Sequence, residues 1–388
     1  MAAATTAPLA LINARVLTEH GFETGRALLI AEGRVAALID PSDARARAAK
    51  LHDLDGLTLV PGFIDTQVNG GGGVLFNDAP NVETIRRIAS AHRRFGTTGL
   101  LPTLISDDFE VMRAAIAAVD EAITQQVPGI LGIHLEGPYL AETRKGVHDA
   151  TKFRVPCAEE IRLVTSLRHG KTLLTIAPEC IPTRTLAEFI SRRAIVAAGH
   201  TAATYAQICT ALDAGLSGFT HLYNAMTPLA GREPGVVGAA LDDKQSWCGV
   251  IVDGHHVHPA ALRVALAAKS RGKMFLVTDA MPPVGSDSAS FPINGEIASV
   301  RDGKLTTSDG TFAGSILDMA QAVRNTVEWL DVPLDEAVRM ASTYPADFIG
   351  LSASHGRIAP GHAADLVALD ERLQVRATWI GGMVEEYP

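Results

Sequence analysis

The chain has 388 residues, 47% of them hydrophobic, and is therefore long enough to bury a large core. Its formal net charge of −9 argues against general nucleic-acid binding, which requires a basic surface. The four cysteines lie far apart without a CxxC pair, as expected of free thiols in a reducing compartment: Cys157, Cys180, Cys209 and Cys248.

The N-terminal segment, MAAATTAPLALINARVL, lacks the basic region and unbroken apolar core of a signal peptide. No apolar run approaches the roughly 20 residues of a membrane span. We therefore expect a cytoplasmic protein that partners neither membranes nor nucleic acids.

The two chain ends share one pattern. Residues 8–40 consist of short β-rich runs broken by turns, and residues 356–386 look the same. We expect residues 1–56 and 357–388 to form one composite β-sandwich domain. Residues 57–356 then remain for a second domain.

That middle part alternates β-rich runs with helix-like segments, which predicts an α/β fold of βα units. Eight such units favour a TIM-type (β/α)8 barrel, with an open doubly wound sheet as the alternative. The sixth unit is the weakest, because residues 226–243 resemble a loop more than a helix. The expected strands are 59–65, 99–106, 129–137, 172–179, 194–200, 218–224, 247–254 and 274–281.

After the eighth strand, the sequence IASVRDGKLTTSDG predicts a hairpin that turns at Asp302 and Gly303. We expect this hairpin to be an insertion that covers the mouth of the barrel.

Polar residues follow the C-terminal ends of the predicted strands. In barrel enzymes, the catalytic groups lie at these strand ends. A single histidine after a strand is usually a hydrogen-bonded core residue, but several in one barrel converge on its axis. Glu136, His200 and His221 offer one carboxylate and two imidazoles, the three-ligand set of a catalytic zinc-type site. The other groups at or near strand ends are Asp65, Gln67, Asn69, His134, Glu179, Asn224, Asp253, His255, His256 and Asp279.

Asp279 follows the eighth strand and would lie beside that site. A carboxylate there could accept a proton from an attacking water molecule and return it to the leaving nitrogen. The structural alternative is a capping residue for the next loop.

Nine motifs in order resemble the amidohydrolase superfamily, and within it the N-acetylglucosamine-6-phosphate deacetylases. The resemblance spans residues 61–319, and GRIAPGHAADLVALD extends it to the C-terminal end. The motifs are PGFIDTQVNG (61–70), HLEGPYL (134–140), KGVHDA (145–150), AGHTAATY (198–205), THLYNAMTPL (220–229), GREPG (231–235), DGHHVHP (253–259), VTDAM (277–281) and AGSILDM (313–319).

The resemblance implies roles for individual residues. Glu136, His200 and His221 would bind the metal, Asp279 would be the acid and base, and His148 would polarise the acetyl carbonyl. The residues that it places around the phosphorylated sugar are Val147, Asn224, Ala225, Arg232, His256, Ile316 and Leu317. His255 is the alternative to His256.

Many relatives carry a His-x-His motif on the first strand for a second metal. This chain has Gln67 and Asn69 there, and amides are poor ligands for a zinc-type ion. We therefore expect one divalent ion per subunit, with zinc preferred over iron, manganese or cobalt.

The resemblance implies hydrolysis of the acetamide of N-acetyl-D-glucosamine 6-phosphate to D-glucosamine 6-phosphate and acetate, in amino-sugar catabolism, by a homodimer. Two alternatives stay open. One is a cyclic-amide or nucleobase hydrolase, and the other is a non-catalytic sugar-phosphate sensor.

Two further features receive an ordinary interpretation. The Gly70–Gly73 run lacks a phosphate-binding register and is predicted to be a flexible loop beside the active site. His92 lies in a polar helical segment and is expected at the surface.

Overall fold

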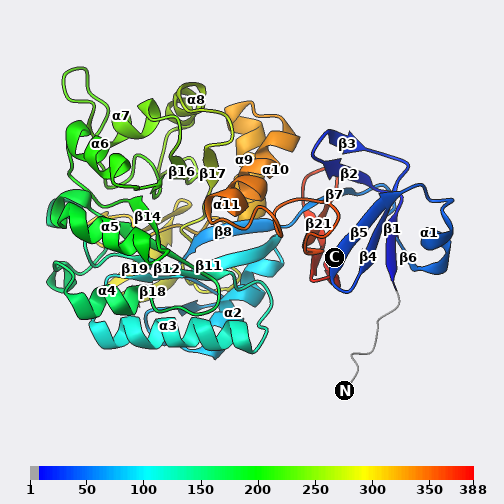
Figure 1. Cartoon of the computed structure of the whole chain (residues 1–388), viewed down its shortest axis with the longest axis horizontal. Coiled ribbons are helices and arrows are strands. Elements are labelled where there is room, and N and C mark those ends of the chain that lie inside the picture. The colour runs from blue at the N-terminus through cyan, green and yellow to red at the C-terminus, as the bar shows by residue number, and fades with distance from the viewer. Residues whose placement is uncertain (1–7) are drawn as a thin grey trace.

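The computed structural model describes residues 8–388 and consists of a barrel beside a smaller β-domain (Figure 1). Residues 1–7 of the predicted β-domain lie outside the described part. Eight parallel strands pair in chain order around the barrel: β8 (Phe63–Val68), β11 (Thr97–Ile105), β12 (Gly132–Glu136), β13 (Lys171–Ile176), β14 (Ile195–Ala198), β15 (Gly218–Phe219), β16 (Trp247–Val250) and β17 (Met274–Leu276).

The barrel closes between the end of its first strand, β8, and the residues just after its last strand, β17. Val68 forms a parallel bridge with Ala280, and the Asp279 amide donates to the Gln67 carbonyl at 3.0 Å. The buried Asp65 carboxylate strengthens this seam by accepting from the Thr278 hydroxyl at 2.5 Å. The predicted (β/α)8 barrel is confirmed, and the open sheet is excluded.

Helices cover the outside of the barrel and pack apolar side chains against the strands. They are α2 (Val82–Arg93), α3 (Phe109–Thr124), α4 (Ala158–Val164), α5 (Thr183–Ser191), α6 (Tyr205–Asp213), α7 (Gly235–Asp242), α8 (Pro259–Ala268), α9 (Met319–Leu330), α10 (Leu334–Ala341) and α11 (Thr343–Phe348). No helix within residues 8–388 combines the length and apolarity needed to cross a membrane.

The sixth unit contains a helix that the sequence prediction missed. Seven of the eight residues of α7 are buried, from Gly235 to Leu241. A helix buried on nearly all sides has no polar face, so its sequence lacks the periodicity by which a surface helix is recognised.

Both chain ends contribute to the β-domain, which has two sheets. One contains β1 (Leu9–Ile12), β4 (Ala27–Ala31), β5 (Arg34–Ile39) and β6 (Lys50–Asp53), with α1 (Ala44–Ala48) preceding β6. The other contains β2 (Arg15–Thr18), β3 (Gly21–Glu23), β7 (Thr58–Pro61), β21 (Leu366–Leu369), β22 (Val375–Ile380) and β23 (Met383–Glu386). A buried cluster that includes Leu28, Leu59 and Trp379 joins residues of the two sheets.

The run 59–65, predicted as one barrel strand, is divided between two strands. β7 pairs with β2 and β21 of the β-domain, whereas β8 pairs with β11 of the barrel. Gly62 stands between them, where an added Cβ would lie 1.9 Å from the Thr98 hydroxyl oxygen. The change of sheet therefore occurs where no side chain fits.

The predicted hairpin is present and belongs to a three-stranded meander. Its strands are β18 (Ser290–Ile293), β19 (Glu296–Arg301) and β20 (Lys304–Thr306). Asp302 and Gly303 form the turn with φ of 51° and 76°, the left-handed conformation that such a turn requires. Asn294 of the meander donates to the Val147 carbonyl at 2.7 Å, which connects the insertion to the loop that carries His148.

The glycine run after β8 is paired rather than a flexible loop. It forms a small hairpin of β9 (Gly70–Gly71) and β10 (Val74–Leu75), and an added Cβ on Gly70 would lie 2.5 Å from the Val74 carbonyl oxygen. His92 is fully buried, which corrects the surface prediction, and its Nε2 lies 2.9 Å from the Gly70 carbonyl. The backbone carbonyl gives this polar side chain a partner inside the core.

Candidate active site

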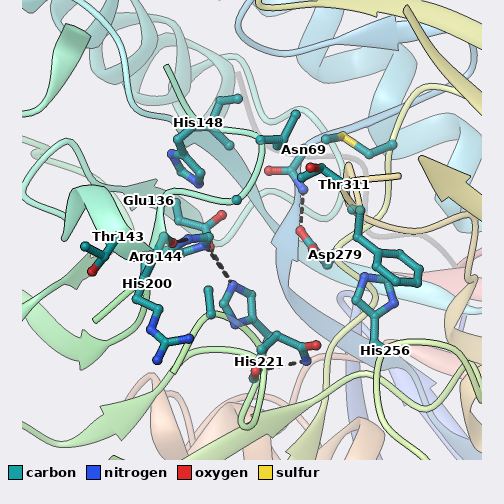
Figure 2. Close-up of a pocket in the computed structure, with 18 residues that line it drawn as sticks. Asn69, Glu136, Thr143, Arg144, His148, His200, His221, His256, Asp279 and Thr311 are labelled. Carbon is teal, nitrogen blue, oxygen red and sulfur yellow. Dashed lines mark hydrogen bonds and ion pairs between the residues drawn. The ribbon is translucent and has the colours of Figure 1, made fainter. Parts of the chain in front are cut away.

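Side chains from four strand ends converge at the mouth of the barrel (Figure 2). Glu136 ends β12, and His200, His221 and Asp279 follow β14, β15 and β17. Glu136 Oε1 lies 3.0 Å from His221 Nε2 and 3.2 Å from His200 Nε2, and the two ring nitrogens are 3.1 Å apart. These three ligand atoms are close enough to contact one ion.

The backbone turns sharply at three of these residues. His200, His221 and Asp279 have φ values of 48°, 33° and 53°, in the left-handed region that non-glycine residues rarely occupy. Such strain persists only where surrounding contacts impose it, and it concentrates at functional sites. At His200 the constraint includes Glu179, which accepts from the Thr201 hydroxyl at 2.5 Å and the Ala202 amide at 2.6 Å.

Hydrogen bonds distinguish the ring nitrogens of His200 and His148. His200 Nδ1 faces the Arg144 carbonyl at 2.8 Å, so it must carry a proton and leaves a lone pair on Nε2. His148 Nδ1 instead accepts from the Ser106 amide at 3.3 Å, so the neutral ring carries its proton on Nε2. Burial lowers the pKa of His148 to about 3, which keeps this ring neutral.

Glu136, His148 and His200 also form a group whose ligand atoms lie within 4.8 Å of one another. The proton on His148 Nε2 makes that nitrogen a donor, so the set of Glu136, His200 and His221 is the better match to a metal.

The two buried carboxyl groups have different proton affinities. Burial raises the pKa of Glu136, but the close imidazoles of His200 and His221 outweigh burial and hold that pKa well below its usual value. Burial, together with the charge of Glu136, raises the pKa of Asp279 to about 6. Glu136 is therefore suited to remain an anionic ligand, and Asp279 to gain and lose a proton.

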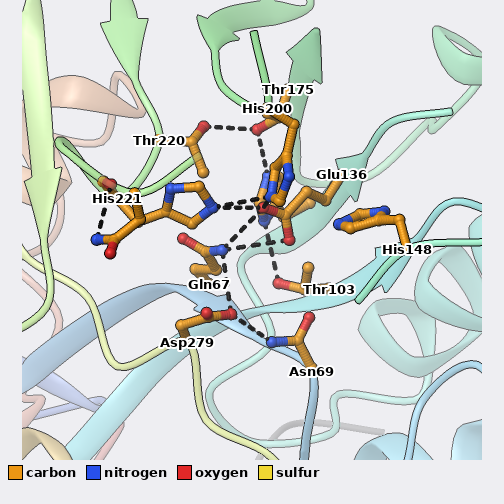
Figure 3. A network of polar contacts seen from close by, with 12 residues as sticks. Gln67, Asn69, Thr103, Glu136, His148, Thr175, His200, Thr220, His221 and Asp279 are labelled. Carbon is orange, nitrogen blue, oxygen red and sulfur yellow. Dashed lines mark hydrogen bonds and ion pairs between the residues drawn. The ribbon is translucent and has the colours of Figure 1, made fainter. Parts of the chain in front are cut away.

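The first barrel strand contributes amides to the same site. Gln67 Nε2 lies between the carboxylates of Glu136 and Asp279, and Asn69 Nδ2 donates to Asp279 (Figure 3).

A cavity of about 310 Å³ opens above these groups. The predicted site residues that line it are Glu136, Val147, His148, His200, His221, Asn224, Ala225, His256 and Asp279. Arg232, Ile316 and Leu317 are not among the lining residues. Arg232 lies in the exposed stretch 228–233.

His256 rather than His255 lines the cavity. Asp253 accepts from His256 Nδ1 at 2.6 Å and from the amides of both histidines at 2.9 Å. These three hydrogen bonds to Asp253 hold the loop so that the His256 ring faces the cavity.

Sequence reasoning missed other lining residues, among them Thr143, Arg144, Met281, Thr311 and Phe312. Arg144 contributes a permanent positive charge, and its side chain forms no ion pair with residues 8–388. The only hint was the basic pair Arg144–Lys145 three residues before His148. Thr311 and Phe312 come from the insertion after β17, whose path the sequence does not reveal.

Known proteins share this architecture along nearly the whole chain. The Amidohydrolase family model matches residues 58–384. N-acetylgalactosamine-6-phosphate deacetylase of Shewanella sp. (strain ANA-3) is 45% identical over 373 residues, which are 95% of this chain and 94% of the relative. N-acetylglucosamine-6-phosphate deacetylase of Haemophilus influenzae is 34% identical over 97% of this chain and 99% of the relative.

A solved structure matches equally well. The crystal structure of N-acetylglucosamine-6-phosphate deacetylase from Pasteurella multocida has a TM-score of 0.94 and 36% identity, covering 98% of this chain and 100% of that chain. The matching region contains both the barrel and the converging strand-end residues. The chain therefore belongs to the amidohydrolase family.

Proposed function

We propose that the protein is a metal-dependent deacetylase that converts N-acetyl-D-glucosamine 6-phosphate into D-glucosamine 6-phosphate and acetate, in amino-sugar catabolism. The observation that carries this proposal is the convergence of Glu136, His200 and His221 beside a second carboxylate, Asp279, under one cavity. That arrangement suits hydrolysis of an amide.

The donor set fits one divalent ion, with zinc preferred. Glu136 supplies a carboxylate with a low pKa, His200 presents an Nε2 lone pair, and His221 Nε2 faces the same carboxylate oxygen. A divalent ion held there supplies Lewis acidity toward a water molecule and the acetamide carbonyl.

Asp279 moves the proton in this proposal. Its Oδ1 accepts from Asn69 at 2.6 Å and Gln67 at 3.2 Å, which leaves Oδ2 for proton transfer. This oxygen takes a proton from the attacking water molecule and returns it to the departing nitrogen. The second transfer is needed because an amine leaves far more readily than an amide anion.

His148 stabilises the negative charge that develops on the carbonyl oxygen. Its neutral ring donates from Nε2, because Nδ1 is occupied by Ser106.

The phosphate end of the substrate requires hydrogen-bond donors within the same cavity. Asn224, Ala225 and His256 line this cavity, and Arg144, whose backbone carbonyl faces His200, adds a guanidinium to the lining residues. Arg232 does not line the cavity of its own subunit. We propose that the protein is a homodimer in which Arg232 of one subunit completes the phosphate site of the other.

The sugar itself has a second candidate. The Shewanella relative at 45% identity is named for N-acetylgalactosamine 6-phosphate, which differs from the first candidate only in configuration at C4. The residues proposed for chemistry act at C2 and are indifferent to that configuration.

The decisive experiment measures acetate release and metal content on one sample. The substrates are the two phosphorylated epimers and unphosphorylated N-acetylglucosamine. We expect turnover of at least one phosphorylated sugar, a much lower kcat/KM without the phosphate, and about one ion per chain.

Chelation should abolish activity, and added Zn²⁺ should restore it. Release of acetate from none of these sugars by the metal-loaded protein would falsify the proposal.

A further inference from the structure

Gln67 contacts both carboxylates of the site through one nitrogen. Its Nε2 lies 3.1 Å and 3.2 Å from the two oxygens of Glu136, and 3.2 Å from Oδ1 of Asp279 (Figure 3). The side chain is 2% exposed and is not among the cavity-lining residues, so no substrate is expected to touch it.

Asn69 contacts only one of the two carboxylates. Its Nδ2 donates to Asp279 Oδ1 at 2.6 Å, and no bond joins its side chain to Glu136 within the described range 8–388. The opposite orientation of the amide would place two oxygens at that distance. The contact with a carboxylate oxygen therefore identifies the NH₂ group.

Backbone hydrogen bonds hold the side-chain amides of Gln67 and Asn69 in place. The Gln67 carbonyl accepts from the Asp279 amide at 3.0 Å, and the Asn69 amide donates to the Ala280 carbonyl at 2.9 Å. These bonds join the end of β8 to the segment that follows β17. The side chains of Gln67 and Asn69 therefore have little freedom to turn away from the carboxylates that they contact.

Two buried carboxylates at one site repel each other, and polar hydrogens that lie between them offset this repulsion. From this geometry we propose that Gln67 is a positioning residue that orients Glu136 as a ligand and Asp279 as the acid and base together. Asn69 orients Asp279 alone. The inference rests on the proposed function for the roles of Glu136 and Asp279.

This arrangement predicts different effects for the two substitutions. Gln67→Met keeps the length of the side chain without its N–H groups, so it should weaken Zn²⁺ binding about 10- to 100-fold and also lower kcat. Asn69→Leu should lower kcat but leave Zn²⁺ affinity within about twofold of the wild type. Affinity is measured on full-length protein by competition with a chromophoric chelator, without reference to activity.

Two controls keep the comparison informative. Gln125→Met removes an exposed side-chain amide that bonds, among the described residues 8–388, to Glu121 alone. It should change neither affinity nor turnover. Near-ultraviolet circular dichroism establishes that each variant is folded, and Gln67→Ala replaces Gln67→Met if the latter is not.

Unchanged Zn²⁺ affinity in folded Gln67→Met or Gln67→Ala protein would overturn the inference. Equal losses of affinity in the Gln67 and Asn69 variants would also overturn it, because they would indicate a general disturbance of β8. Failure of the proposed function has a different signature, since wild-type protein would then bind Zn²⁺ without releasing acetate.

Discussion

Asp279 combines three properties that a proton carrier at this position needs. Burial raises its pKa to about 6, its Oδ1 is engaged by two amides, and it lines the cavity. A carboxyl group with a pKa close to neutrality exchanges protons readily in both directions.

Replacing Asp279 by Asn should therefore separate metal binding from turnover. The amide has nearly the same shape but cannot accept and return a proton, so kcat should fall by a factor on the order of 10² to 10⁴. Metal content, measured by atomic emission, should stay at the wild-type value. Asp287→Asn, at an exposed carboxylate eight positions later, serves as the control. Near-normal turnover in Asp279→Asn protein would remove this residue from the mechanism.

His92 links stability to pH. Burial lowers the pKa of His92 to about 4, whereas an unfolded histidine titrates near 6.5. Between those values the unfolded chain binds a proton that the folded chain does not. Stability is therefore lost as pH falls below about 6.5.

Comparison with His92→Gln isolates this contribution. The glutamine can still donate to the Gly70 carbonyl but does not titrate. Between about pH 7 and about pH 5, the wild type should lose about 2 kcal/mol of unfolding free energy relative to the variant. Denaturant unfolding at each pH measures the difference. A difference in unfolding free energy that does not change with pH would mean that burial does not lower the pKa of His92 in the folded protein.

At the level of elements, the short hairpin β9–β10 is a structural support of the site. It begins at the residue after Asn69, and the Asn69 carbonyl accepts from the Phe76 amide at 2.9 Å. The hairpin thereby holds the end of β8 from which Gln67 and Asn69 reach the carboxylates.

Gly70→Ala should test this support. The added Cβ would lie 2.5 Å from the Val74 carbonyl oxygen and 2.9 Å from Pro282, so the backbone must shift. We expect destabilisation of about 1 to 3 kcal/mol and a lower kcat, measured by thermal unfolding and acetate release. An unchanged Gly70→Ala protein would show that the hairpin tolerates displacement.

At the level of the whole molecule, the proposed phosphate site depends on the subunit in which Arg232 acts. Arg232 and Leu229 lie on one exposed loop, and Leu229 is 56% exposed. An exposed apolar side chain beside an arginine on one loop supports the proposed subunit contact.

Mixed dimers distinguish the two possible locations of Arg232. Co-expressed Arg232→Ala and Asp279→Asn subunits should regain about half of the wild-type activity per mixed dimer if Arg232 acts across the interface. One of the two sites then has both an intact Asp279 and an arginine from its neighbour. Activity no higher than that of Arg232→Ala alone would place Arg232 within its own subunit. Differently tagged subunits allow the mixed species to be purified and assayed.

The sequence by itself determined the barrel, the composite β-domain and the residues at the strand ends. Alternating apolar runs locate strands, and a barrel presents their ends at one mouth, so Glu136, His200, His221 and Asp279 could be expected together. It could not identify α7, which is buried on nearly all sides, or divide residues 59–65 between two sheets. It also could not distinguish the buried His92 from a surface histidine.

Only the tertiary structure decided which loop residues line the cavity, which histidine nitrogen carries a proton, and which amide bonds to which carboxylate. Arg144, Thr311 and Phe312 reach the cavity along paths set by packing between distant segments. The left-handed backbone at His200, His221 and Asp279 likewise depends on contacts across the barrel. Local patterning specifies helices and strands, because burial acts along each segment. The atoms of a site instead meet through contacts between residues up to about two hundred positions apart, as for Asn69 and Asp279.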